Sequence, residues 1–167
     1  MTLKRTFLTL SLVFSIAVLA SAQQFKALVY TKTAGFRHQS IPNAVVAMKK
    51  MGEKQVFSVY TSEDPKVLEE ESLMKYDVLI LISTTGTIFD EKAQASLQKF
   101  VQAGKGVVGV HAAADSEYQW PWYNKMMGAY FLSHPALGHV DSAWEDDVFL
   151  KHLYGGIWYA ATGHPFK

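Results

Sequence analysis

The sequence predicts a doubly wound α/β fold, with helices on both faces of a mainly parallel β-sheet. Short apolar segments alternate with amphipathic, helix-like segments from residue 25 to residue 110, which is the pattern of consecutive βα units. One segment, Val78–Ile82 (VLILI), is apolar at every position, as expected for a strand that is buried on both faces of a parallel sheet.

The first predicted strand, residues 25–30 (FKALVY), is followed by a polar loop over residues 31–40. Ser40 is expected to cap the next helix, which carries Pro42 in its first turn, where the missing N–H costs little. Gly52 is expected to end this helix. The residues of its apolar face recur at helical spacing: Ile41, Val45 and Met48.

The remaining elements continue the alternation. Residues 56–60 form the second predicted strand, and a short helix begins at residues 64–65. After the VLILI strand, Asp90 is expected to cap a longer helix that Gly104 ends. The fourth predicted strand is Gly106–Val110 (GVVGV). The core-facing residues of the helix before it are Ala93, Leu97, Phe100 and Val101.

The N-terminus has the three parts of a secretory signal peptide. A basic pair (residues 4–5) precedes an apolar run over residues 7–19, and residues 20–22 (ASA) fit the small-x-small cleavage pattern. The run is shorter than the ~20 residues that a membrane-spanning helix needs. We therefore expect a signal peptide over residues 1–22, an exported (periplasmic or extracellular) domain over residues 23–167, and no membrane contact after cleavage.

The composition of the 167-residue chain excludes several classes of site. The chain contains no cysteine, so disulfides, thiolate metal ligands and a cysteine nucleophile are excluded. Lys and Arg total 16 and Asp and Glu total 15, and this near balance gives no sign of the basic face that nucleic-acid binding needs. We expect a small-molecule partner and no nucleic acid, while the oligomeric state stays open.

The candidate site is predicted in loops 31–40, 83–89 and 111–116, because ligands of doubly wound sheets bind beyond the carboxyl ends of the strands. The fourth strand ends in His111, a single large polar residue among small ones. This is the steric pattern of a nucleophile elbow, in which a tight turn presents one side chain. An imidazole there could act as a general acid or base, or could bind a metal ion.

Three further histidines are expected near the same face of the molecule: His38, His134 and His139. Three of these four imidazoles, together with a carboxylate such as Asp115, could bind Zn²⁺ or another divalent ion. The spacing of the histidines matches no compact metal motif. A metal site and an acid–base site therefore both remain open.

Other side chains in these loops suit a sugar or an anion. Thr85 and Gly86 combine a small hydroxyl with a glycine, which permits close backbone approach to a ligand, and the indole of Trp120 could stack on a sugar ring. Arg37 could contact an anionic or hydroxyl-rich ligand. The first loop superficially resembles a flavodoxin phosphate loop, but residues 36–39 separate it from the helix, so FMN is not expected.

Three separated segments, in this order, resemble the ThuA-like (trehalose utilisation) domain: FKALVYTKTAGFRHQSI, YDVLILISTTGTIFDEKAQASLQKFVQAGKGVVGVHAAAD and W-x-WY-x-x-x-x-GAYFLSHP. The resemblance covers most of residues 25–135 and implies a flavodoxin-like fold of the class I glutamine-amidotransferase-like superfamily. Together with the βα alternation it predicts parallel strands in the order 2-1-3-4. It places His111 where the amidotransferase nucleophile would be. The family's link to sugar catabolism implies a carbohydrate ligand, notably a disaccharide oxidised to a 3-keto form.

The C-terminal segments ALGHV and FLKHLYGGIWYAATG resemble the family's last strand-end motif and closing helix. In the family a long stretch separates the HP and LGH motifs, whereas here only residues 136–137 do. The resemblance identifies the chain as a member that is shortened between Pro135 and Gly138, so that the last strands of the sheet are missing. The short spacer keeps His139 near the HP motif without necessarily bringing it to His111.

The residues and the resemblance together favour an exported protein that processes oxidised sugars by acid–base chemistry. His111 would be the general acid or base, with His38 and Asp115 assisting it. Two alternatives remain, namely a noncatalytic sugar-binding or interaction module and an inactive truncated remnant. The residues expected to contact the substrate are Thr85, Gly86, His134, His139 and Trp120.

We predict that the exported protein begins at Gln23, because cleavage should follow the ASA sequence. N-terminal sequencing of the protein recovered from the periplasmic fraction measures this directly. Recovery of a chain that begins at Met1 from that fraction would contradict the prediction.

Overall fold

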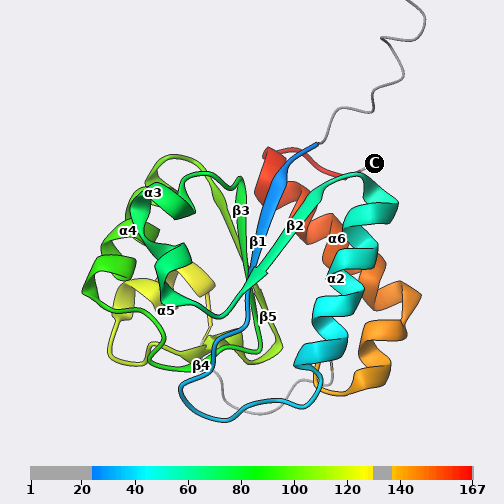
Figure 1. The fold of residues 1–167 in the computed structure, drawn as a ribbon, viewed down its shortest axis with the longest axis horizontal. Coiled ribbons are helices and arrows are strands. Elements are labelled where there is room, and N and C mark those ends of the chain that lie inside the picture. The colour runs from blue at the N-terminus through cyan, green and yellow to red at the C-terminus, as the bar shows by residue number, and fades with distance from the viewer. Residues whose placement is uncertain (1–23, 130–136, 167) are drawn as a thin grey trace, which may run out of the picture.

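The main sheet has four parallel strands in the order β2-β1-β3-β5 (Figure 1). The computed structural model describes residues 24–129 and 137–166. The strands are β1 (Lys26–Tyr30), β2 (Ser58–Ser62), β3 (Val78–Ile82) and β5 (Gly106–Val110). The predicted order 2-1-3-4 is confirmed, and it matches the first four strands of the flavodoxin-like order 2-1-3-4-5.

Helices cover both faces of this sheet (Figure 1). On one face lie α2 (Ile41–Gln55) and α6 (Asp147–Thr162), and on the other lie α3 (Glu70–Leu73), α4 (Glu91–Gln102) and α5 (Pro121–Met127). Side chains of each strand alternate between the two faces. In the central strand, Ile80 packs in the core under α2 and α6, whereas Leu79 and Leu81 pack in the core under α3, α4 and α5.

The apolar strand β3 is buried at all five positions, as its sequence predicts. In the described residues β5 is an edge of the main sheet, and no fifth strand continues it. The helices of the described part of the chain include none that is long and apolar enough to span a membrane. The expected signal peptide and His134 lie outside the described residues.

Two predicted boundaries, the end of α2 and the start of β2, are wrong. The helix continues past Gly52 to Gln55, and Val56 ends it with a left-handed backbone (φ 59°). The second strand consequently begins at Ser58, two residues later than expected. Gly52 has a packing role instead, because a Cβ at this position would lie 2.7 Å from a methyl carbon of Val59. The glycine therefore lets α2 approach β2 closely.

The helices that follow β2 and β3 begin as predicted. After β2, the carboxylate of Asp64 caps a 3₁₀ helix, η1 (Pro65–Leu68), which is separate from α3. After β3, the carboxylate of Asp90 accepts a hydrogen bond of 2.8 Å from the N–H of Ala93 and thereby caps α4. Gly104, with φ 79°, follows the last turn of α4. A side-chain cap of this kind contributes ~1 kcal/mol to stability.

A small second sheet, which the sequence did not predict, lies beyond the carboxyl ends of the main strands (Figure 1). It pairs β4 (Thr85–Gly86) with β6 (Asp115–Ser116) in parallel. Between β5 and β6 the chain forms a 3₁₀ helix, η2 (His111–Ala114). Strands of two residues have no periodicity that a sequence pattern could reveal. This small sheet joins the loops that follow β3 and β5.

Two buried tyrosines differ in how their hydroxyl groups are satisfied. The Tyr30 hydroxyl, at the end of β1, has no hydrogen-bond partner among the described residues. The Tyr123 hydroxyl donates a 2.8 Å hydrogen bond to the carbonyl of Ala113. Burial, with a smaller contribution from the negative charges of Asp64 and Glu63, raises the pKa of Tyr30 to about 12. Burial also raises the pKa of Tyr123 well above its usual value.

We predict that Tyr30→Phe leaves the free energy of unfolding at pH 7 unchanged or higher, because it removes an unsatisfied buried hydroxyl. Tyr123→Phe should lower it by about 1 kcal/mol through the lost hydrogen bond. Urea unfolding of both variants measures the difference. Equal destabilisation by the two substitutions would contradict this assignment.

Alkaline pH should distinguish Tyr30→Phe from the wild type. An unfolded tyrosine ionises near pH 10, whereas folded Tyr30 ionises near pH 12. Between these two values ionisation favours the unfolded state, so the free energy of unfolding of the wild type is unaffected by Tyr30 below pH 10 and falls as the pH rises from 10 towards 12. Tyr30→Phe should lose less stability over this interval than the wild type does, as measured by urea unfolding at each pH.

Candidate functional site

Three histidines from distant parts of the chain meet beyond the carboxyl edge of the sheet. Nδ1 of His139 lies 3.0 Å from Nε2 of His111. The ring of His38 packs edge-on against that of His111, with 4.5 Å between ring centroids and 86° between planes, and lies 5.4 Å from that of His139. One ring nitrogen from each histidine lies within 4.8 Å of the other two. We call these residues the histidine cluster.

His111 takes its position from a strained turn at the end of β5. Its backbone is left-handed, with φ 55°, directly after an extended strand. A residue other than glycine in this conformation costs on the order of 1 kcal/mol and is common at functional sites. Ala112 and Ala113 are buried behind the turn. The predicted tight turn that presents one polar side chain is therefore present.

His139 reaches His111 because the carbonyl of Gly138 is held from two sides. It accepts a 3.0 Å hydrogen bond from Oγ of Ser40 and a 3.1 Å hydrogen bond from Nε1 of Trp144. Gly138 has φ 83°, and a Cβ on it would lie 3.2 Å from Cβ of His111. The short spacer before Gly138 thus does not keep His139 away from His111.

Ser40 has a different role from the predicted one. It occupies the N-cap position of α2, but its hydroxyl makes no capping hydrogen bond there. The hydroxyl instead donates its hydrogen bond to the carbonyl of Gly138, 98 residues further along the chain. No local sequence signal distinguishes these two roles, because a serine at the same position before a helix can serve in either.

The loop that carries His38 is fixed by Thr85 and Gly86. Oγ1 of Thr85 donates a 2.8 Å hydrogen bond to the carbonyl of Phe36, and the Thr85 carbonyl accepts one of 2.8 Å from the N–H of Ala34. Gly86 has φ 73°, and a Cβ on it would lie 3.0 Å from the nitrogen of Gly35. Thr85 is buried. Thr85 and Gly86, expected to contact the substrate, thus lie where they shape the site by holding its first loop.

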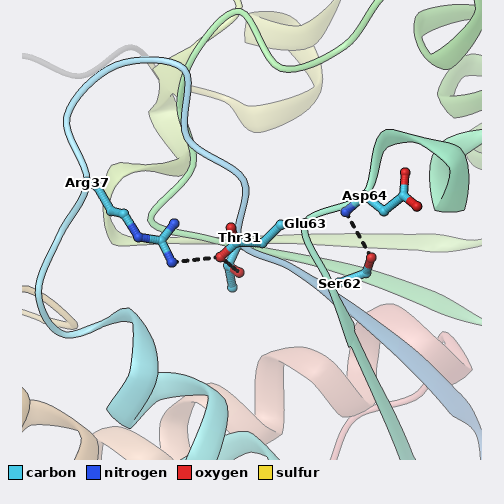
Figure 2. Close-up of polar contacts among 5 residues, drawn as sticks. All are labelled: Thr31, Arg37, Ser62, Glu63 and Asp64. Atoms are coloured by element: carbon cyan, nitrogen blue, oxygen red, sulfur yellow. Dashed lines mark hydrogen bonds and ion pairs between the residues drawn. The ribbon is translucent and has the colours of Figure 1, made fainter.

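A second anchor holds the same loop to the end of β2 (Figure 2). Nη2 of Arg37 lies 2.7 Å from Oε1 of Glu63, and Oγ1 of Thr31 donates a 3.0 Å hydrogen bond to the same oxygen. Both side chains of the ion pair are about half exposed. Arg37, a predicted contact for an anionic ligand, therefore forms an ion pair with Glu63. With Phe36 packed edge-on against it, His38 is buried.

Asp115 and Trp120 are not part of the histidine cluster. The Asp115 carboxylate accepts a hydrogen bond from the hydroxyl of Tyr118. Trp120 stacks on Trp122, with 5.0 Å between ring centroids, and packs at the core under α4 and α5. Within the described residues the cluster contains histidines and no carboxylate.

Glu117 is a structural residue of the site that the sequence analysis missed. It is buried, has φ 56°, and its Oε1 accepts hydrogen bonds from the N–H groups of Ile88 (2.6 Å) and Phe89 (3.1 Å). These contacts tie the loop after β4 to the segment after β6. In the sequence Glu117 is an acidic residue in a polar loop, and such residues are usually solvated. Its burial depends on a contact with residues about 30 positions away.

The arrangement supports two kinds of chemistry. A neutral imidazole has one N–H donor and one acceptor nitrogen, so the 3.0 Å contact between His139 and His111 lets one ring donate to the other. A proton can therefore be held within this pair. The same three rings offer three nitrogen donors at one point, and His38, His111 and His139 are the described residues that could hold a metal ion.

Comparison with known proteins identifies one family. The family described as "ThuA: Trehalose utilisation" matches residues 26–137, a range that contains His38 and His111 but ends before His139. No curated protein sequence matches the chain.

Two solved structures are similar to the chain. A putative ThuA-like protein from Bacteroides uniformis ATCC 8492 matches with a TM-score of 0.52 and 25% identity, over 64% of this chain and 44% of that one. A putative ThuA-like protein from Parabacteroides merdae ATCC 43184 matches with a TM-score of 0.50 and 24% identity, over 60% of this chain and 37% of that one. The chain thus spans less than half the length of either protein.

We predict that Gly138→Ala disturbs the cluster more than Gly163→Ala does. Both glycines have positive φ (83° and 72°), so alanine should cost about 1 kcal/mol at either position. A Cβ at Gly163 meets nothing within 4 Å, whereas one at Gly138 lies 3.2 Å from Cβ of His111. Thermal unfolding and imidazole ¹⁵N spectra measure the difference, and identical effects of the two substitutions would contradict it.

Proposed function

Because the chain belongs to the ThuA family, which is described as acting in trehalose utilisation, we propose that it processes an oxidised sugar at the histidine cluster. The single observation that carries this proposal is the 3.0 Å contact between His139 and His111 at the carboxyl edge of the sheet. Two paired imidazoles beyond the strand ends are suited to moving a proton on a small carbonyl compound.

The proposed reaction begins with the loss of a proton next to a keto group. The keto group acidifies the adjacent C–H, and an imidazole nitrogen of the His111–His139 pair takes up the proton, which leaves an enolate and an imidazolium. If a glycosidic oxygen lies on the next carbon, the enolate expels it, the C–O bond breaks, and the imidazolium returns its proton to the leaving alcohol. If the neighbouring carbon carries a hydroxyl group instead, the proton can return to the former carbonyl carbon while the hydroxyl proton moves to the former keto oxygen, which gives isomerisation. The cluster needs no other proton donor for either outcome.

The burial of the three histidines suggests a different role for His38 than for His111 and His139. His38 is buried, whereas His111 and His139 are partly exposed. We assign the proton transfer to His111 and His139, because these two residues are partly exposed. His38 packs edge-on against both rings and is a positioning residue in this scheme.

Export is part of the same proposal. The basic, apolar and small-residue parts of residues 1–22 support secretion through a cleaved signal peptide. An exported domain without cysteine depends on its two packed cores for stability, and those cores lie on both sides of the sheet. The substrate would then be an extracytoplasmic sugar.

A noncatalytic sugar-binding module is the second candidate function. The loops that Thr85 and Glu117 hold in place would suit it, since ordered loops favour ligand binding whether or not a reaction follows. A binding module would use the same loops, but no group in it would need to exchange a proton with the ligand. An inactive remnant is the third alternative, and it is separated from the other two by the absence of a cooperative melting transition.

We predict that the wild type converts a 3-keto-disaccharide, and that His111→Asn and His139→Ala lower kcat by roughly 10²-fold or more. Asparagine is chosen for His111 because it tolerates the left-handed backbone found there. His152→Ala and His164→Ala are matched controls, since both histidines are exposed and outside the cluster, and they should keep full activity.

Chromatographic assay of the released sugar, with thermal unfolding to verify folding, measures these effects. Unchanged turnover in folded His111→Asn and His139→Ala would place the reaction elsewhere. Sugar binding by the wild type without conversion would favour the binding module.

A further inference from the structure

We infer that His38, His111 and His139 form a binding site for one divalent transition-metal ion of the zinc class. One ring nitrogen of each residue lies within 4.8 Å of the other two. Neutral imidazole is a ligand of Zn²⁺, Co²⁺, Ni²⁺ and Cu²⁺, whereas Mg²⁺ and Ca²⁺ require oxygen donors. Because the described cluster contains no carboxylate, the chemistry of its donors selects the first group of ions.

The distances between the donors are close to those of a formed site. With Zn–N bonds of about 2.0–2.1 Å, two ligands of a tetrahedral ion are roughly 3.3 Å apart. The His111–His139 pair, at 3.0 Å, is already near this value. No pair in the cluster exceeds 4.8 Å, so closure around an ion requires movements of about 1.5 Å or less, which ring rotations can supply.

Binding would exchange one interaction for another within the pair. The nitrogen that donates in the His139–His111 contact must present a lone pair to the ion, so its proton moves to the other nitrogen of the same ring or is released. The hydrogen bond between the rings is lost, and two metal–nitrogen bonds replace it. Metal binding therefore changes the protonation and the hydrogen bonding of these two rings.

The backbone around each ligand is held before any ion binds. His111 lies on the left-handed turn after β5, and the carbonyl next to His139 is fixed by Ser40 and Trp144. The loop of His38 is fixed by the hydrogen bond from Thr85 to Phe36. Ligands that are ordered in advance lose little entropy on binding, which raises affinity.

Three protein ligands leave a fourth position for water or for a substrate oxygen, as in catalytic zinc sites. In this respect the inference builds on the proposed function, since it uses the same cluster. With an ion bound, the ligating nitrogens can no longer accept a proton. Hydroxide formed from a metal-bound water would then be the proton acceptor, or the ion would polarise the keto oxygen.

Calorimetry of the mature chain, freed of metal with a chelator, tests the site with metal ions alone. We expect one Zn²⁺ or Co²⁺ per chain and no binding of Mg²⁺. His38→Gln, His111→Asn and His139→Ala should each weaken Zn²⁺ binding by about 10²-fold, because each removes one of three ligands. The controls His152→Ala and His164→Ala should bind as the wild type does.

A second measurement guards against variants that fail to fold. The visible spectrum of the Co²⁺-loaded wild type should be that of a tetrahedral or five-coordinate ion with nitrogen ligands, and Zn²⁺ should raise the Tm of the wild type. Absence of binding in the wild type would overturn the inference, as would equal Zn²⁺ affinity in the wild type and in folded His139→Ala.

These outcomes are separable from those of the proposed function, because no sugar is present in the binding experiments. Metal binding without conversion of a keto sugar would uphold the ion site and refute the proposed reaction. Conversion by metal-free protein that binds no ion would uphold the reaction and refute the ion site.

Discussion

The carbonyl of Gly138 is the point on which the histidine cluster depends. It receives hydrogen bonds from Ser40 at the start of α2 and from Trp144 in the 3₁₀ helix η3 (Asp141–Glu145). These two bonds bring a segment from late in the chain to the carboxyl edge of the sheet, next to the turn after β5. Without them His139 would have no fixed relation to His111, and the cluster would lose one of its three rings.

The parallel sheet determines where residues from distant loops can come into contact. All four main strands end at the same edge, so the loops after β1, β3 and β5 are neighbours although they are far apart in sequence. The small sheet of β4 and β6 joins two of these loops, and Thr85 joins the third through the carbonyl of Phe36. The buried carboxylate of Glu117 adds a further link. Rigid loops on a fully packed sheet allow imidazoles to be held at contact distance.

The fold was predictable because its signals are local. The uninterrupted apolar run of β3 reports burial on both faces, and the carboxylate of Asp90 caps α4 as its position before the helix predicts. The two boundary errors, at the end of α2 and the start of β2, have a common cause. Gly52 was expected to end the helix, but its place is set by the close approach of Val59 on β2. A sequence pattern cannot distinguish a glycine that ends a helix from a glycine that lets a neighbouring strand pack closely against the helix.

For the site, the sequence alone placed His38, His111 and His139 near one face of the molecule, and His38 and His111 each follow a predicted strand at the edge where ligands bind. It also predicted the tight turn at His111, because small residues surround one large polar residue. The contact of His139 with His111, and the exclusion of Asp115 from the cluster, were settled by tertiary contacts. The physical reason is the separation along the sequence over which each interaction acts. Strand, turn and cap preferences act over a few residues, whereas the hydrogen bond from Ser40 joins residues that are 98 positions apart and that only the folded chain brings together.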